Sequence, residues 1–139
     1  MSAAASTLEQ QLWDFVYAYD AAYDRAAQDN GLSAAQACLL DRLAGSSRSM
    51  GDLAAELLCD ASNVTQLVAR LEARGLVTRV ADPADRRVKR VSITAAGRRL
   101  RSTVGESFGF PADRLGRLTE EERLQLSGLL SKVLAPSGS

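Results

Sequence analysis

The sequence predicts a mostly α-helical domain that carries one small antiparallel β-hairpin, and three observations support this fold class. Apolar residues recur at helical spacing in segments along most of the chain. Between residues 76 and 93 the period changes from 3.6 to 2, and two short runs flank the turn-forming segment Asp82-Pro83-Ala84-Asp85. Three pairs of a Ser or Thr with an acidic or amide residue three positions later mark helix starts.

Composition limits the classes of function. A chain of 139 residues with 46% hydrophobic residues can form one domain with its own core. It has no apolar stretch long enough to span a membrane and no basic, apolar leader, so we expect a cytoplasmic protein. Histidine is absent, which removes the commonest general base and a common zinc ligand. We therefore expect no catalysis, no metal site and no cofactor.

Charge is distributed unevenly along this neutral chain. Residues 61–101 contain ten Lys or Arg and three acidic residues, a net charge of +7, whereas residues 1–60 have a net charge of −6 and the remainder −1. A basic segment on an acidic or neutral body is the electrostatic pattern of a duplex-binding surface. A solvated charged face would give the same count, so the neighbouring motifs must decide between the two interpretations.

Four helices are expected before the hairpin. They cover approximately residues 8–29, 33–44, 49–58 and 60–74, with Ser33, Ser49 and Asp60 as caps and Gly31 and Gly75 as stops. The fourth helix has its apolar residues at i, i+3, i+4 and i+7, which predicts a core stripe of Val64, Leu67, Val68 and Leu71.

The hairpin follows this helix directly. We expect strands at Leu76–Val80 and Val88–Ile93, then a helix capped by Thr94, an interruption at Phe108–Pro111 and a last helix that opens with Thr119 and Glu122. Two helices joined by a tight turn and followed by a hairpin make a winged helix-turn-helix.

The outward face of the fourth helix has the side chains that read bases. Gln and Asn can bond adenine in a bidentate manner and the Thr methyl can contact thymine, while small Ala69 and Ala73 let the helix enter a major groove. Base contacts come mostly from the N-terminal half of such a helix. The expected DNA contacts from this helix are Ser62, Asn63, Thr65 and Gln66, with Arg70 on phosphate.

The tip of the hairpin supports the same interpretation. Arg86 and Arg87 can enter a narrow minor groove, with Lys89 beside them on the return strand. Asp82 and Asp85 are poor choices for attracting phosphate, so we interpret them as turn formers that orient the arginines. Which arginine enters the groove and which braces the turn stays open at this point.

Two segments carry a family resemblance. The run from Asp82 to Gly97 resembles the wing signature of the MarR family of bacterial transcription regulators, approximately D-x-x-D-x-R followed by an apolar strand and L-T-x-x-G. The run from Val64 to Val77 resembles the recognition helix of that family and its exit, and Leu118–Glu122 resembles the start of its last helix. The resemblance covers essentially the whole chain in the same order.

The resemblance implies a homodimer that binds a pseudo-palindromic DNA operator, usually as a repressor. Residues 1–32 and 100–139 would form the dimerisation helices and residues 33–99 the DNA-binding lobe of one MarR-like domain, 1–139. Apolar faces on the first and last helices, with no partner inside one lobe, independently favour a C2 dimer. The interruption at Phe108–Pro111 departs from the longer helix that is usual in the family.

The resemblance also implies a small aromatic or anionic effector that releases DNA. The residues expected to line its site are Trp13, Tyr17, Tyr19 and Arg42, with Arg48 as another nearby cation, although an aromatic stripe is also typical of a core or a dimer interface. Two alternatives stay open: a thiol-based redox sensor that uses Cys38 or Cys59, and a winged helix that binds protein. We interpret both cysteines as core residues.

Overall fold

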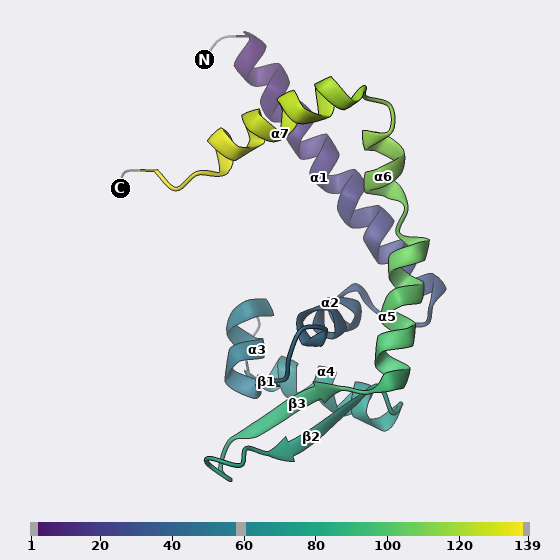
Figure 1. The fold of residues 1–139 in the computed structure, drawn as a ribbon, viewed down its shortest axis with the longest axis vertical. Helices are drawn as coiled ribbons and strands as arrows, with labels where there is room; N and C mark the ends of the chain where they lie inside the picture. Colours follow the sequence, from purple (N-terminus) through teal and green to yellow (C-terminus); the bar gives the residue numbers. More distant parts are fainter. Residues whose placement is uncertain (1–2, 58–60, 138–139) are drawn as a thin grey trace. The chain divides into compact units, whose positions relative to one another are not determined.

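The computed structural model describes residues 3–57 and 61–137, and the chain divides into two compact units, Met1–Phe108 and Gly109–Ser139. Figure 1 shows the elements of each unit. Unit 1 contains α1 (Ala3–Asp29), α2 (Ala34–Leu43), β1 (Arg48–Ser49), α3 (Met50–Leu57), α4 (Ala61–Ala73), β2 (Val77–Ala81), β3 (Lys89–Ile93) and α5 (Ala95–Ser107). Unit 2 contains α6 (Phe110–Leu115) and α7 (Glu120–Leu134).

The predicted helix caps are confirmed where the structure describes them. The Ser33 hydroxyl accepts the backbone N–H of Gln36, and the Thr119 hydroxyl accepts that of Glu122. The side chains of Gln36 and Glu122 accept the backbone N–H of Ser33 and Thr119 in return, so both capping boxes are complete. Thr94 caps α5 by accepting the N–H of Gly97. The expected cap Asp60, the turn at Cys59 and the side chain of Ser62 lie outside the described residues.

The sheet has three strands, not the two that the sequence predicts. Strand β3 lies in the centre, antiparallel to β2 from Val77↔Ile93 to Ala81↔Lys89 and antiparallel to β1 at Arg48↔Val91 and Ser49↔Arg90. Because β1 is only two residues long, it has no alternation that a pattern could detect. Ser49 still accepts the N–H of Asp52 at 3.1 Å, so it is both a strand residue and the cap of α3.

The core of unit 1 collects residues from all of its helices. The predicted stripe of α4 is largely confirmed, because Val64, Val68 and Leu71 are fully buried and Leu67 is partly buried. Full burial of one such side chain contributes about 1.5–3 kcal/mol. The other buried apolar side chains of largest volume are Leu39, Leu40, Leu43, Leu53, Val77 and Val91.

Among the described residues, two glycines have a positive φ, and both follow the end of a helix. Gly31 and Gly75 both have φ of 74°, a conformation that L side chains rarely adopt. Gly75 thus stops α4 and turns the chain into β2, as the sequence predicts. The first helix begins at Ala3, five residues before the expected start, and ends at Asp29 as expected.

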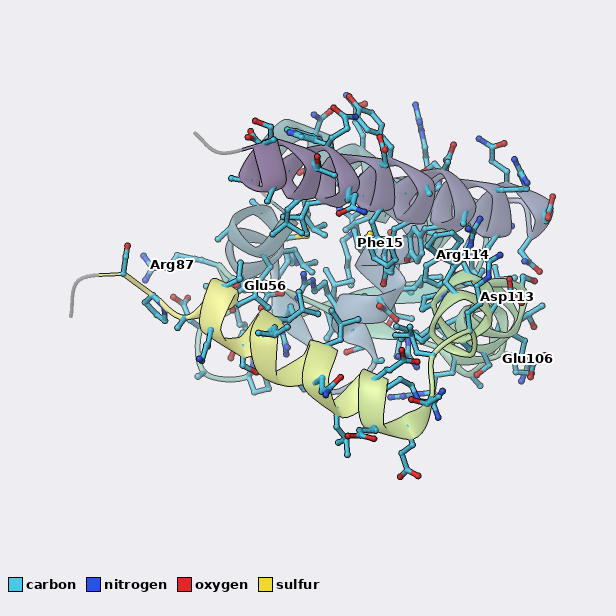
Figure 2. The ribbon with its side chains drawn as sticks, turned by 90° about the horizontal axis from the view of Figure 1, so that it is seen from above. Phe15, Glu56, Arg87, Glu106, Asp113 and Arg114 are labelled. Atoms are coloured by element: carbon cyan, nitrogen blue, oxygen red, sulfur yellow. The ribbon has the colours of Figure 1, made fainter. Side chains whose placement is uncertain are left out.

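Two sets of apolar side chains remain exposed. One follows the N-terminal half of α1 and includes Phe15, which projects from that helix in Figure 2. The other follows α7, where Leu129 is 60% exposed and Leu134 is 77% exposed. Phe108 and Gly109 separate α5 from α6, which confirms an interruption, but Pro111 lies in the first turn of α6, a short helix that the sequence pattern does not predict. Among the described helices, none combines the length and hydropathy that a membrane span requires.

Among the described glycines, Gly97 has the least space for an added side chain. A Cβ there would lie 2.2 Å from the carbonyl oxygen of Leu76 and 2.8 Å from Ile93 Cγ1. We expect Gly97→Ala to lower the free energy of unfolding by about 1–3 kcal/mol, because α5 must move away from the sheet. Urea denaturation followed by circular dichroism measures this.

Gly105, on the same helix, provides the matched control. A Cβ at Gly105 meets no atom within 4 Å, so Gly105→Ala is expected to be neutral or to stabilise by up to about 1 kcal/mol. Equal stability of the two variants would contradict the close approach at Gly97.

Candidate nucleic-acid interface

Helix α4 presents a polar, exposed face. Asn63, Thr65, Gln66 and Arg70 are all exposed, together with small Ala69. The acidic residue of α4, Glu72, lies off this face, where its carboxylate accepts the Arg79 guanidinium at 3.0 Å and the Arg79 backbone N–H at 3.2 Å. The predicted reading face is thus free of exposed carboxylates in the described part of α4.

The wing is the hairpin of β2 and β3, whose tip extends away from the helices of unit 1 (Figure 1). Asp82 begins the turn: its Oδ1 accepts the backbone N–H of Ala84 at 2.8 Å, and its own N–H donates to the carbonyl of Val88. Val88 in turn donates to the carbonyl of Asp85. These bonds confirm that the two aspartates form the turn.

Asp85 holds Arg87. Its Oδ1 accepts both the backbone N–H of Arg87 at 3.1 Å and the guanidinium Nε at 3.2 Å. These bonds from the Arg87 side chain and backbone lower the pKa of Asp85 below its ordinary value. Arg87 nevertheless keeps 91% of its side chain exposed, and Figure 2 labels it at the margin of unit 1.

Asp82 contacts Arg90 and not Arg86 or Arg87, the two arginines that the sequence indicates. Its carboxylate lies 3.5 Å from Arg90 Nη1, and Arg90 also donates to the hydroxyl and the carbonyl of Ser47 at 3.0 and 2.9 Å. Arg90 thus fastens the wing to the segment that precedes β1. Neither aspartate orients Arg86, which is exposed and forms no ion pair or side-chain hydrogen bond with the described residues.

Most of the ten basic residues between 61 and 101 already have partners. Three are ion-paired with Glu72, Asp82 or Asp85, one with Asp41 of α2, and two donate to backbone carbonyls. The basic side chains of this segment without a partner among the described residues are Arg70, Arg86, Lys89 and Arg99. The basic segment 61–101 therefore has fewer cations available for an external partner than its composition indicates.

A shallow hollow of about 400 Å³ lies between the start of α3 and the wing. It is lined by Ser49, Met50, Gly51, Arg87, Val88 and Lys89. Sequence reasoning missed this juxtaposition, because only the pairing of β1 with β3 brings Ser49 next to the wing. The hollow joins two of the predicted DNA contacts, Arg87 and Lys89, to the helix-turn-helix.

A second cavity, of about 310 Å³, lies inside unit 1 between α1, α2 and α5. The rings of Tyr19 and Tyr23 each meet Phe108 edge to face, with centroids 5.0 and 5.2 Å apart. Burial, followed by the nearby Cys38 thiol, raises the pKa of Tyr23. The complete lining is Tyr19, Tyr23, Leu32, Ala37, Leu40, Asp41, Arg101, Ser102, Val104, Gly105 and Phe108.

The four residues expected to bind an effector do not gather there. Only Tyr19 lines the cavity. Trp13 and Tyr17 are exposed on α1, where their rings contact each other at a tilt, and Arg42 is exposed on α2. The cation at the cavity is instead Arg101, whose Nε lies 2.8 Å from Asp41 Oδ1. Within the described residues no cluster of side chains could hold a metal ion. Cys38, which the sequence predicts to be a core residue, is only partly buried and lies beside Tyr23.

Comparisons with known proteins agree with this architecture. The sequence profile described as MarR family matches residues 30–88. The transcriptional activatory protein BadR of Rhodopseudomonas palustris is 34% identical over 98 residues, which cover 61% of this chain and 56% of BadR. The chain spans about half the length of the curated relatives it matches.

Solved structures match over nearly the whole chain. YusO of Bacillus subtilis has a TM-score of 0.76 at 28% identity, covering 96% of this chain and 97% of YusO. CouR of Rhodococcus jostii RHA1, solved with p-coumaroyl-CoA, has a TM-score of 0.76 at 25% identity and covers 100% of this chain and 99% of CouR. The fold and the interface thus define a winged helix-turn-helix protein. Within residues 30–88 the sequence is similar to the MarR family, and the fold of the chain is similar to that of YusO and CouR.

The bond between Asp85 and Arg87 can be tested by titration. Because Arg87 lowers the pKa of Asp85, Arg87→Ala should move the Asp85 midpoint to higher pH, measured by carboxyl-detected NMR. The stabilisation of the turn by this pair is present above the unfolded pKa of an aspartate and is lost as the pH falls through the lowered value.

Arg86→Ala provides the control, because Arg86 does not bond Asp85. If the titration midpoint of Asp85 stayed unchanged in Arg87→Ala, or moved equally in both variants, the bond between Asp85 and Arg87 would be contradicted.

Proposed function

We propose that the protein is a sequence-specific, duplex-DNA-binding transcription regulator that acts without catalysis. One observation carries this proposal: the polar face of α4 and the wing belong to the same compact unit. In the wing, Arg86 is exposed and has no ion-pair partner among the described residues. The shapes match a helix for the major groove and an arginine-bearing ribbon for the adjacent minor groove. A basic wing suits the phosphates of any DNA duplex, whereas a protein partner would have to be acidic at this surface.

Base reading is assigned to α4. Asn63, Thr65 and Gln66 occupy the N-terminal half of the helix, where side chains of such helices reach base edges. Ser62 belongs to the same proposed set. Arg70, one turn further along and without a partner among the described residues, is placed to neutralise a phosphate.

The wing supplies affinity and shape reading. Arg86 is the arginine proposed to enter the minor groove, because neither aspartate of the turn holds it, whereas Asp85 fixes the direction of Arg87. Arg87 and Lys89 line the hollow beside the start of α3. We assign these two cations to the phosphates that flank the groove.

We further propose that two chains form a homodimer on a pseudo-palindromic operator and repress transcription by occupying it. The exposed apolar side chains of α1 and of α7, which lie in residues 1–32 and 100–139, support this proposal. Burial of both faces in a C2 interface would set two copies of α4 about one turn of DNA apart.

The cavity of unit 1 is the proposed effector site. Its aromatic and apolar wall, with Arg101 at the polar side, fits a small aromatic or anionic ligand. CouR, at 25% identity, was solved with p-coumaroyl-CoA, a larger ligand that has an aromatic acyl group and anionic phosphates. Because α5 lines the cavity and leads from the sheet toward the proposed dimerisation helices, an occupant can change the spacing of two DNA-binding lobes.

Salt dependence tests the proposal against a protein-binding role. The logarithm of the DNA affinity should fall linearly and steeply with the logarithm of the salt concentration, by about 0.9 for each phosphate neutralised. Fluorescence anisotropy with a duplex selected from random sequences measures it. A flat dependence, or no binding to any duplex, would exclude the DNA-binding function.

Substitutions on the two surfaces should have different consequences. Arg86→Ala and Arg87→Ala are each expected to weaken binding by about 1–3 kcal/mol with little loss of stability, since both side chains are exposed. Gln66→Ala should instead reduce the preference for the selected sequence over a scrambled duplex.

Arg25→Ala is the charge-matched control for these variants. Arg25 is an exposed arginine of α1, outside the basic segment. If all three interface variants behaved like Arg25→Ala in the same binding assay, the assigned surface would be wrong.

A further inference from the structure

Arg74 belongs to the basic segment, but its guanidinium is directed into the protein's own backbone. It directly follows α4, and its Nη1 donates a hydrogen bond of 2.7 Å to the carbonyl oxygen of Gly31. Its Nη2 also approaches Gly31, because a Cβ built on that glycine would lie only 3.5 Å away. The contact connects the C-terminal end of α4 to the turn between α1 and α2.

That turn is itself fixed to a third helix. Backbone bonds from Asn30, Gly31 and Leu32 to the last turn of α1 close it. The Asn30 side chain then donates to the carbonyl of Ala26 at 2.8 Å and to the hydroxyl of Ser107, the last residue of α5, at 3.1 Å. We call the set Asn30, Gly31, Arg74 and Ser107 the three-helix junction, since it joins the ends of α1, α4 and α5.

The junction adjoins the cavity of unit 1. Leu32 follows Gly31 in the chain, Phe108 follows Ser107, and both line the cavity. A displacement of either wall residue therefore reaches the junction through one peptide unit. On the other side, Gly75 follows Arg74, and its carbonyl accepts the Thr94 hydroxyl at 2.7 Å, so the exit of α4 is held as well.

We propose that Arg74 is a positioning residue for DNA binding: it sets the orientation of α4 against the cavity wall and does not neutralise a phosphate. The inference rests on the proposed DNA-binding function. It separates Arg74 from Arg70, which lies four residues earlier and has no partner among the described residues. Coupling between the cavity and α4 then has a defined physical connection.

The experiment compares Arg74→Ala, Arg74→Lys and Arg70→Ala in DNA binding over a range of salt concentrations, with the selected duplex as probe. Arg74→Ala should weaken binding by about 2- to 30-fold and leave the salt slope unchanged. Arg74→Lys should restore most of the affinity, because one ammonium donor can replace the Nη1 bond. Arg70→Ala should lower the slope by about one, because one phosphate is then no longer neutralised.

Asn30→Ala provides a second variant that changes no charge. It should reproduce the weaker binding of Arg74→Ala at an unchanged slope, and the two effects should not add in the double variant, because both substitutions break one junction. Additive effects would overturn the junction as a unit. Thermal unfolding of each variant, followed by circular dichroism, confirms that the compared proteins are folded.

Two results would overturn the positioning role alone: wild-type affinity in Arg74→Ala, or a slope lowered as in Arg70→Ala. Failure of the wild-type chain to bind any duplex would overturn the proposed function and this inference together.

Discussion

Strand β3 hydrogen-bonds to β2 on one side and to β1 on the other, and the candidate interface depends on this double pairing. Val91 at its centre is fully buried and faces Arg79 and Arg48 in the two registers. The pairing with β2 creates the wing, the pairing with β1 brings the start of α3 beside it, and Thr94, one residue past β3, caps α5. Three parts of the lobe are thus positioned by one strand of five residues.

Electrostatics reinforces that arrangement. Arg90 of β3 bonds both Ser47 and Asp82, so the loop before β1 and the turn of the wing share one guanidinium. Such partly exposed pairs add little stability singly, but they fix directions. Most of the cations near the wing therefore form ion pairs or hydrogen bonds within the protein. The long-range electric field of these cations still favours the approach of a polyanion. Of the cations proposed to contact DNA, Arg70, Arg86 and Lys89 have no partner among the described residues, and Arg87 keeps most of its side chain exposed beside Asp85.

Packing between α5 and the sheet adds a second constraint. Gly97 lets α5 approach the carbonyl of Leu76 so closely that no side chain fits between them. The same helix lines the cavity and, at Ser107, bonds the turn after α1. Cavity, wing and α4 consequently belong to one packed unit, in which a change at the cavity wall has contiguous contacts through which it can reach α4.

Local sequence signals determined most of the elements. Capping pairs at Ser33 and Thr119, the core stripe of α4 and the stop at Gly75 all act within a few residues, so their patterns are readable without a fold. The turn chemistry of Asp82 and Asp85 is local in the same way. The predicted site residues on α4 and the wing follow from this local information, and their roles in DNA binding remain proposals.

Only the tertiary structure decided which distant residues meet. Nothing in the sequence pairs Arg48 with Val91, Asp82 with Arg90 or Arg74 with Gly31, because these partners are separated by turns whose geometry the pattern does not encode. For the same reason, the cavity is lined by Tyr23, Arg101 and Phe108 in place of Trp13, Tyr17 and Arg42. The sequence by itself determined most of the helices, the wing and its charge; side-chain contacts across the fold decided which charges are engaged and which remain available.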